Sequence, residues 1–210
     1  MNNLALERTL ILARHGQTAW NLAGRYQGHS DPPLCEIGKL ECATLASQLL
    51  GRGIRSIITS PLLRAQETAQ IIAHKLAIHL IKIDSRLTEV NFGAWEGLTQ
   101  VEVKRYWPAI LQTWKTEPDT VRFPAGETLQ EARNRLRAVL RDLAQSTGQA
   151  GFTTLLVTHT GLIRLAVQDC SEPRPTYRHI EVPPGSMRAF TLRSSEGATD
   201  PILENASLVS

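Results

Sequence analysis

Two stretches of the sequence, TLILARHG at residues 9–16 and TTLLVTHTG at residues 153–161, share one pattern. Each is a short run of aliphatic and β-branched residues that leads into a histidine and then, directly or after one residue, a glycine. Such runs are typical of parallel strands, which are buried because helices cover both faces of their sheet. Ligands of these sheets bind beyond the carboxyl ends of the strands. The sequence therefore predicts an α/β protein whose site lies where these two strands end.

The rest of the chain continues the alternation of strands and helices. Strands are expected at residues 9–13, 56–59, 79–83, 153–158 and 186–193, the last at an edge of the sheet. Apolar residues at helical spacing predict helices at residues 37–50, 61–76, 127–145 and 161–168. Ser60 and Pro61 fit an N-cap and a first helical residue, and the tail after Ser194 is expected to lack regular structure. Without a repeat or a linker, residues 1–210 are expected to form one domain.

Composition narrows the function classes. The 210 residues include 23 Lys and Arg against 20 Asp and Glu, a net charge of +3 that is too scattered to favour nucleic acid and suits small anionic ligands. Cys35, Cys42 and Cys170 form no CxxC pair, so a reducing compartment, the cytoplasm, is expected. No apolar run approaches the roughly 20 residues that span a bilayer, and the first residues lack the order of a signal peptide, so no membrane partner is expected.

Charged and imidazole side chains follow each of the four predicted parallel strands. Arg14 and His15 follow the first strand, and Arg64 lies in the first helical turn after the second. Glu89 lies in the loop after the third strand, and His159 follows the fourth. Because the carboxyl ends of parallel strands meet at one edge of a sheet, these side chains are expected to lie together. Two histidines, two arginines and a glutamate form the inventory of a phosphoryl-transfer site.

Six segments match a known family in its order: ARHGQTAWN, RYQGHSDPPL, TSPLLRAQETA, LTEVNFGAWEG, FPAGET and VTHTGLIR. On these motifs the chain resembles the histidine phosphatase superfamily, also called phosphoglycerate-mutase-like, and in particular its phosphatase branch. The resemblance implies a three-layer fold with a mostly parallel central sheet, helices on both faces and a short cap insertion at residues 95–126 over the carboxyl ends of the strands. It also implies a phosphomonoesterase that hydrolyses a small phosphorylated metabolite through a phosphohistidine.

The resemblance assigns His15 as the nucleophile, Glu89 as the proton donor, and Arg14, Arg64 and His159 as the phosphate pocket. Chemistry supports these roles, because permanently charged guanidinium groups concentrate positive charge around the phosphate oxygens. His15 can attack only through an unprotonated nitrogen, so a backbone carbonyl is expected to hold the N–H of the other, whereas His159 is expected to stay protonated. Glu89 can protonate the leaving alkoxide and then deprotonate a water, so no metal or other cofactor is expected.

The resemblance extends to residues around this centre. Asn21 matches an asparagine that touches the phosphate, and Thr160 stands beside the phosphate where glycine is usual, in a position to cap the following helix. The helices after Ser60 and Thr160 are expected to offer free N–H groups to the phosphate. Gln27, Gly28 and Trp95 are expected to line the pocket, with Trp107 as a second candidate for its wall.

Two further features concern the cap and a helix end. In the cap, Lys104, Arg105, Lys115 and Arg122 either meet a second acidic group of the substrate or are solvated. Cys35 stands where threonine is usual at the start of a helix, and a thiol is a poor cap, a loss of about 1 kcal/mol.

The sequence lacks the motifs of several other phosphate-handling enzymes. No cysteine has an arginine six positions later, no two aspartates form D-x-D, and no glycine-rich P-loop is present, which argues against three other classes of phosphate-handling enzyme. Two alternatives stay open: a cofactor-dependent phosphoglycerate mutase and a non-catalytic phosphate-binding regulatory protein. The segment between Glu89 and Glu127 is short, and it reads LQTWKTEPD, with only Lys115, where the resemblance implies paired arginines in a mutase; both features favour the phosphatase. We expect a monomer or a homodimer acting on a small phosphate ester.

Overall fold

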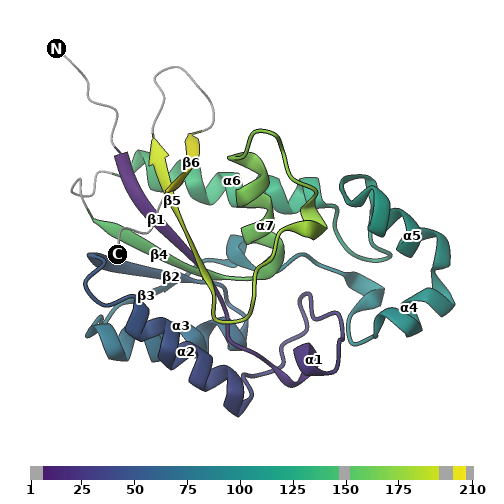
Figure 1. Cartoon of the computed structure of the whole chain (residues 1–210), viewed down its shortest axis with the longest axis horizontal. Helices are drawn as coiled ribbons and strands as arrows, with labels where there is room; N and C mark the ends of the chain where they lie inside the picture. Colours follow the sequence, from purple (N-terminus) through teal and green to yellow (C-terminus); the bar gives the residue numbers. More distant parts are fainter. Residues whose placement is uncertain (1–6, 147–151, 194–200, 207–210) are drawn as a thin grey trace.

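The computed structural model describes residues 7–146, 152–193 and 201–206. Within these residues, six strands form one sheet in the order β3-β2-β4-β1-β5-β6 (Figure 1). The strands are β1 (Glu7–Arg14), β2 (Ile54–Thr59), β3 (Ile81–Ile83), β4 (Thr153–Thr158), β5 (Met187–Arg193) and β6 (Ile202–Ala206). The first four pair in parallel, and β5 and β6 are antiparallel. The expected mostly parallel sheet is confirmed.

Helices cover both faces of this sheet, so the three-layer α/β fold is confirmed. On one face, α2 (Glu36–Gln48) and α3 (Leu63–Leu76) pack against alternate strand residues such as Ile11 and Ile57. On the other, α6 (Leu129–Gln145) and α7 (Thr160–Asp169) cover residues of the opposite strand face. Because successive strand residues point to opposite faces, the central strands must be apolar on both sides. All six residues of β4 are accordingly buried.

The helix α6 shows how local sequence sets an element. Thr128 is its N-cap: the Thr128 hydroxyl accepts the Glu131 N–H, and the Glu131 carboxylate accepts the Thr128 N–H. This reciprocal pair satisfies two backbone donors that a helix start otherwise leaves free. Apolar residues at helical spacing, including Leu129, Leu136 and Leu140, are buried against the sheet.

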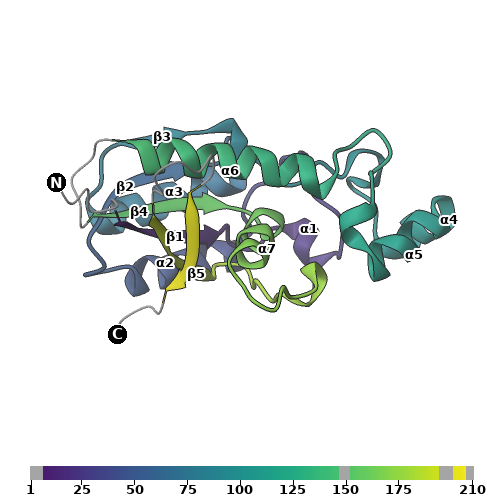
Figure 2. The ribbon, with the colours of Figure 1, turned by 90° about the horizontal axis from the view of Figure 1, so that it is seen from above.

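Residues 95–126 carry two helices, α4 (Gln100–Tyr106) and α5 (Pro108–Thr116), which project beyond one end of the sheet (Figure 2). Short elements complete the described chain: α1 (Ala19–Leu22), η1 (Ser85–Leu87), η2 (Gly93–Trp95), η3 (Pro118–Thr120) and η4 (Tyr177–His179). The projecting segment is joined to the rest by aromatic contacts, with ring centroids of Trp114 and Tyr177 5.6 Å apart and those of Phe92 and Phe123 4.8 Å apart.

Several predicted boundaries are wrong. The helix α3 begins at Leu63, with Leu62 as its extended N-cap and no side-chain capping bond. The Ser60 hydroxyl accepts the Leu62 N–H over 3.3 Å and lies 2.8 Å from His159 Nε2. The predicted third strand shortens to Ile81–Ile83. The helix predicted at residues 37–50 is α2 at Glu36–Gln48, and the helix predicted at residues 61–76 is α3 at Leu63–Leu76.

The prediction for the end of the chain is also wrong where the structure describes it. β6 pairs with β5 in antiparallel register, so β5 is not an edge strand and the segment Ile202–Ala206 is regular. Leu203 is buried on the sheet, which explains the pairing. The expected lack of structure at residues 194–200 and 207–210 lies outside the described residues.

The start of α2 provides a test of stability. Cys35 is its N-cap in extended conformation and makes no side-chain capping bond. The substitution Cys35→Ser supplies an oxygen acceptor there, so it should raise the free energy of unfolding by about 0.5–1 kcal/mol. Urea denaturation would measure the change. The reverse substitution Thr128→Cys at the N-cap of α6 should lower stability by a similar amount, and equal midpoints for all three proteins would contradict the prediction.

Candidate active site

The register of the parallel strands brings the expected residues together. Arg14 of β1 lies opposite Thr158 of β4, and the His15 N–H donates to the Thr158 carbonyl over 3.1 Å. The rings of His15 and His159 therefore lie side by side, with centroids 5.1 Å apart. The expected meeting of these residues at one sheet edge is confirmed.

His15 is held in one orientation by its neighbour. Its ring nitrogen Nδ1 lies 2.7 Å from the Gly16 carbonyl oxygen. Burial, with Arg64 and Arg14 nearby, lowers the pKa of His15 well below its ordinary value of 6.5. The ring is therefore neutral, its proton lies on Nδ1, which donates to the carbonyl, and Nε2 keeps its lone pair. This is the arrangement expected of a nucleophile.

His159 differs from expectation in two respects. Its side chain is fully buried, and its Nε2 lies 2.8 Å from the Ser60 hydroxyl. Burial and then the charge of Arg64 lower its pKa well below 6.5, the direction opposite to the expected protonated form. Its Nδ1 has no hydrogen-bond partner in the described part of the chain. Ser60, predicted only as a helix cap, is the residue that orients it.

Two arginines remain charged despite burial. Arg64 is 0% exposed and donates to the backbone carbonyls of Ser30 and Gly28 over 2.7 and 2.8 Å. Arg14 donates to the Val182 carbonyl. Desolvation lowers the pKa of each guanidinium to about 10, which still leaves both charged at neutral pH. Backbone carbonyls, which carry no net charge, fix these groups without neutralising them.

Glu89 lies in the loop after η1, and its carboxylate reaches the start of α7. Its carboxylate accepts the Gly161 N–H at 3.0 and 3.2 Å and the Val90 N–H at 2.8 Å. A Cβ atom at position 161 would lie 2.2 Å from the Glu89 Oε1, so this close approach requires glycine. Glu96, the other acid of the same loop, instead accepts the backbone N–H groups of His29 and Ser30.

At each of the two helix starts, one backbone N–H is already bound by a carboxylate of the protein. The Leu63 N–H at the start of α3 donates to the Asp31 carboxylate over 2.6 Å. The Gly161 N–H of α7 is bound to Glu89. His159 is the N-cap of α7 and Thr160 its first residue, so the expectation that Thr160 caps the helix is wrong.

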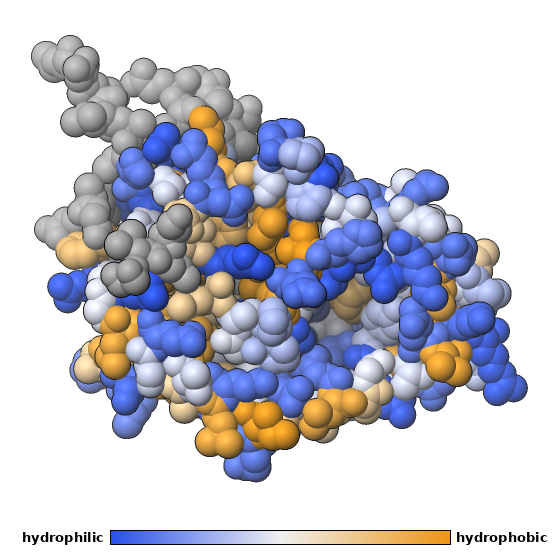
Figure 3. Space-filling view, in the orientation of Figure 1, coloured by the Kyte–Doolittle hydropathy of each residue, from blue (hydrophilic) through white to orange (hydrophobic). Residues whose placement is uncertain are grey.

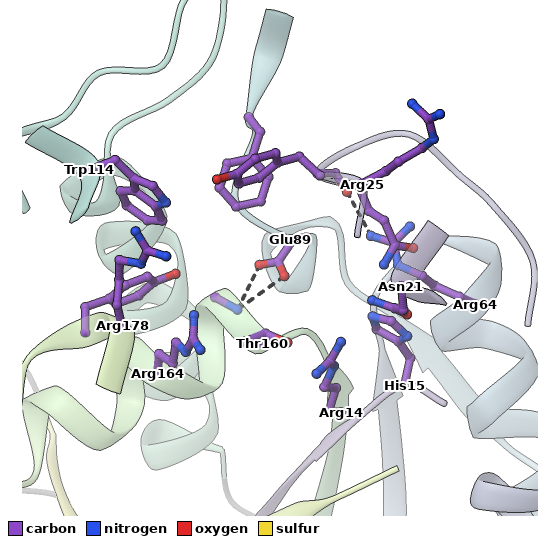
Figure 4. A pocket seen from close by; sticks show the side chains of 16 residues that line it. Arg14, His15, Asn21, Arg25, Arg64, Glu89, Trp114, Thr160, Arg164 and Arg178 are labelled. Carbon is purple, nitrogen blue, oxygen red and sulfur yellow. Dashed lines mark hydrogen bonds between the residues drawn. The ribbon is translucent and has the colours of Figure 1, made fainter. Parts of the chain in front are cut away.

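These residues surround a cavity of about 210 Å³ (Figure 4). On the face shown in Figure 3, mostly hydrophilic residues surround a hollow beside the α4–α5 segment. The cavity is lined by Arg14, His15, Asn21, Arg25, Tyr26, Gln27, Gly28, Arg64, Glu89, Phe92, Trp114, Thr160, Gly161, Arg164, Tyr177 and Arg178. Eight of the ten predicted site residues are among them, and His159 and Trp95 are not.

Two predictions for the pocket wall need correction. Trp95 is fully buried and packs on Tyr26, at 5.2 Å between ring centroids, so it supports a lining residue without lining the cavity itself. Trp107 does not line the cavity, whereas Trp114 does. The basic cap residues Lys104, Arg105, Lys115 and Arg122 are exposed and lie outside the lining, which favours solvation over contact with the substrate.

Eight lining residues were not predicted as site residues: Arg25, Tyr26, Phe92, Trp114, Gly161, Arg164, Tyr177 and Arg178. Arg164 stands in the quoted motif VTHTGLIR, one helical turn after Thr160, so helical spacing could have placed it at the site. Arg178 lies in η4, in a stretch without any motif, and only the folded chain brings it to the cavity.

Among the described residues, no three His, Cys, Asp or Glu side chains are grouped as a metal would require. The same residues contain no helix long and apolar enough to cross a membrane.

Comparison with known proteins identifies the class. The family model of the histidine phosphatase superfamily (branch 1) matches residues 10–201, so the chain belongs to this superfamily. Among curated proteins it is 37% identical to phosphoserine phosphatase 1 of Hydrogenobacter thermophilus over 151 residues, which cover 72% of this chain and 70% of that protein. It is 36% identical to a probable phosphoglycerate mutase of Yersinia pestis, over 71% of this chain and 68% of the relative.

Solved structures agree with this assignment. A mycobacterial glucosyl-3-phosphoglycerate phosphatase in complex with VO3 superposes with a TM-score of 0.83 at 25% identity, covering 95% of this chain and 98% of that one. A putative α-ribazole-5'-P phosphatase from Escherichia coli gives a TM-score of 0.78 at 25% identity, over 97% and 98% of the two chains. These relatives support a phosphatase, with phosphoglycerate mutase as the alternative.

The lowered pKa of His15 predicts a pH effect on stability. Above about pH 6.5 the imidazole is neutral in both states; below it, only the unfolded chain takes up the proton, so stability falls with falling pH. The expected slope from one such residue is up to about 1.4 kcal/mol per pH unit. Denaturation of wild type and His15→Asn between about pH 6 and pH 5 should show a shallower slope in the variant. Equal slopes would contradict the prediction.

Proposed function

We propose that this protein is a metal-independent phosphomonoesterase of the histidine acid-type class, acting on a small phosphorylated metabolite through a phosphohistidine on His15. The observation that carries the proposal is the bond between His15 Nδ1 and the Gly16 carbonyl, which leaves Nε2 unprotonated beside two charged arginines, of which Arg64 is fully buried. A phosphate dianion is attracted by Arg14 and Arg64 at the place where the nucleophile lies.

In the first half of the proposed reaction, His15 Nε2 attacks phosphorus while the bond to the ester oxygen breaks. Arg14 and Arg64 stabilise the charge on the phosphoryl oxygens, with Asn21 and Thr160 as further contacts and Gln27 and Gly28 at the rim. Protonated Glu89 gives its proton to the leaving alkoxide.

In the second half, the Glu89 carboxylate takes a proton from water, and the resulting hydroxide attacks the phosphohistidine to release inorganic phosphate and restore His15. His159 lies behind His15, where we assign it to orient the site through Ser60 and to stabilise charge on the phosphoryl group as the reaction proceeds. We further propose that the protein is cytoplasmic and works as a monomer or a homodimer.

A phosphoglycerate mutase is the second candidate, favoured by the Yersinia relative. A mutase must keep its phosphohistidine from water and return the phosphoryl group to an acidic product. The basic cap residues that could serve this purpose are exposed and outside the cavity lining, which favours hydrolysis. A panel of phosphoserine, phosphoglycerates, sugar phosphates and ribazole phosphate, run beside a mutase assay with 2,3-bisphosphoglycerate, separates the two activities. Binding of phosphate without turnover of any ester would instead favour a regulatory protein.

The covalent step can be trapped. Brief mixing with labelled substrate and quenching should give a protein adduct that is stable to base and labile to acid, and His15→Ala should abolish it because the accepting nitrogen is gone. Activity should survive EDTA. Loss of activity with EDTA and its return with Mg²⁺ would contradict the metal-independent mechanism.

The leaving group distinguishes the two acids of the loop. An alkyl phosphate expels a basic alkoxide that needs a proton, whereas p-nitrophenyl phosphate expels a stable phenolate. In single-turnover experiments, Glu89→Gln should therefore lower the rate at which an alkyl phosphate phosphorylates the enzyme by about 100-fold or more. The rate with p-nitrophenyl phosphate should fall much less. Glu96→Gln is the matched control. It should change the phosphorylation rates with both substrates by the same factor, because the Glu96 carboxylate binds only the loop at residues 29–30. The opposite pattern would identify Glu96 as the acid.

A further inference from the structure

The cavity carries more positive charge than one phosphate group requires. Five of its lining residues are arginines, and Glu89 is its only carboxylate among the described residues. Arg25 is paired with Glu102 at 3.3 Å and also donates to the Gly97 carbonyl, and Arg14 and Arg64 belong to the phosphate site. Arg164 and Arg178 remain without an assigned task.

These two arginines form a group of their own. Figure 4 shows Arg164 and Arg178 together near Trp114, with Glu89 between them and the side of the cavity that holds His15 and Arg64. They come from α7 and η4, two elements separate from the β1 and β2 ends that supply the phosphate site. The cavity therefore has two cationic sides.

The Arg178 guanidinium is held against an aromatic ring, and one of its nitrogens lacks a hydrogen-bond acceptor. Its guanidinium carbon lies 5.7 Å from the centre of the Trp114 ring, a cation–π contact that holds the side chain against the wall. Its Nη1 is buried and has no hydrogen-bond partner within the described residues. A buried N–H group without an acceptor is costly, so an acceptor arriving with a ligand would be bound favourably.

Arg164 is fixed beside it. Its Nε donates to the Ile180 carbonyl over 2.9 Å, and its guanidinium carbon lies 5.5 Å from the centre of the Tyr177 ring. A carbonyl satisfies one donor without cancelling the charge. Two guanidinium groups held in this way match the charge and the planar geometry of an anionic oxygen pair.

We propose that Arg164 and Arg178 form a second anion subsite, so that the substrate is a phosphate monoester with another anionic group, a carboxylate or a second phosphoryl group. This inference rests on the proposed function for the place of the scissile phosphate. Both groups would bind in one cavity of about 210 Å³, which suits a small metabolite.

The test compares substrates that differ in one group. 3-Phosphoglycerate and glycerol 3-phosphate differ only in a carboxylate against a hydroxymethyl group, and fructose 1,6-bisphosphate and fructose 6-phosphate differ in a second phosphoryl group. In at least one pair, kcat/KM of the wild type should favour the more anionic member by about tenfold or more, the value of one charge-assisted hydrogen bond. Which pair shows the preference identifies the second group.

Arg178→Gln should lower that preference about tenfold, mainly through KM, because it removes the unpaired donor. Arg178→Lys, which keeps the charge without the planar fork, should restore part of it. The matched control is Arg105→Gln on α4, which removes an exposed arginine outside the cavity and should leave the preference unchanged. No preference in either pair, or a preference that survives Arg178→Gln, overturns the subsite.

A binding measurement keeps this result separate from the proposed function. Calorimetric titration of His15→Ala with 3-phosphoglycerate, glycerol 3-phosphate and the two fructose phosphates needs no turnover. If the wild type hydrolyses no ester but His15→Ala binds the more anionic member of a pair more tightly, the proposed function fails and the subsite stands. If esters are hydrolysed and binding shows no preference in either pair, the subsite fails and the proposed function stands.

Discussion

The parallel pairing of β1, β4 and β2 is the constraint on which the site depends. Its register places Arg14 opposite Thr158 and Thr59 opposite Val157, so the residues that follow these strands share one edge. Hydrogen bonds from the His15 and Ser60 N–H groups to β4 extend the pairing into the loops. The apolar contacts on both sheet faces fix the strands, because a slip of one residue would turn each side chain to the opposite face.

Within that frame, the site combines charge with low solvation. Arg14 and Arg64 are bound by carbonyl oxygens, which orient the guanidinium groups without cancelling their charge, and the Asp31 carboxylate lies 4.0 Å from Arg64. That charge, together with burial, lowers the pKa of both His15 and His159. The cations that attract a phosphate therefore also keep the attacking imidazole unprotonated. One electrostatic arrangement accounts for binding and for nucleophile activation, and it costs folding stability that ligand binding can return.

The sequence predicted the layers of the fold and the centre of the site, because both depend on local patterns. Apolar runs mark the buried strands, and His15 and Arg64 follow two of these runs closely in the chain. The sequence alone therefore places both residues at the carboxyl edge of the sheet. Predictions failed where a side chain had two uses. Ser60 could cap a helix or orient His159, and Trp95 could face the cavity or the core; tertiary packing decided both. No sequence motif surrounds Arg178, which lies in η4 and lines the cavity only because the folded chain brings η4 there.

The cap, residues 95–126, also acts on the site in a way that its sequence did not predict. Its four basic residues were candidates for a second acidic group, yet they are exposed, and the arginines that line the far side of the cavity come from α7 and η4. The cap contributes Trp114, against which Arg178 lies. An aromatic ring can hold a cation in place without neutralising it, which a carboxylate could not do. The cap therefore acts on the site by positioning a charge that belongs to another element, and substrate preference should depend on this contact between two distant segments of the chain.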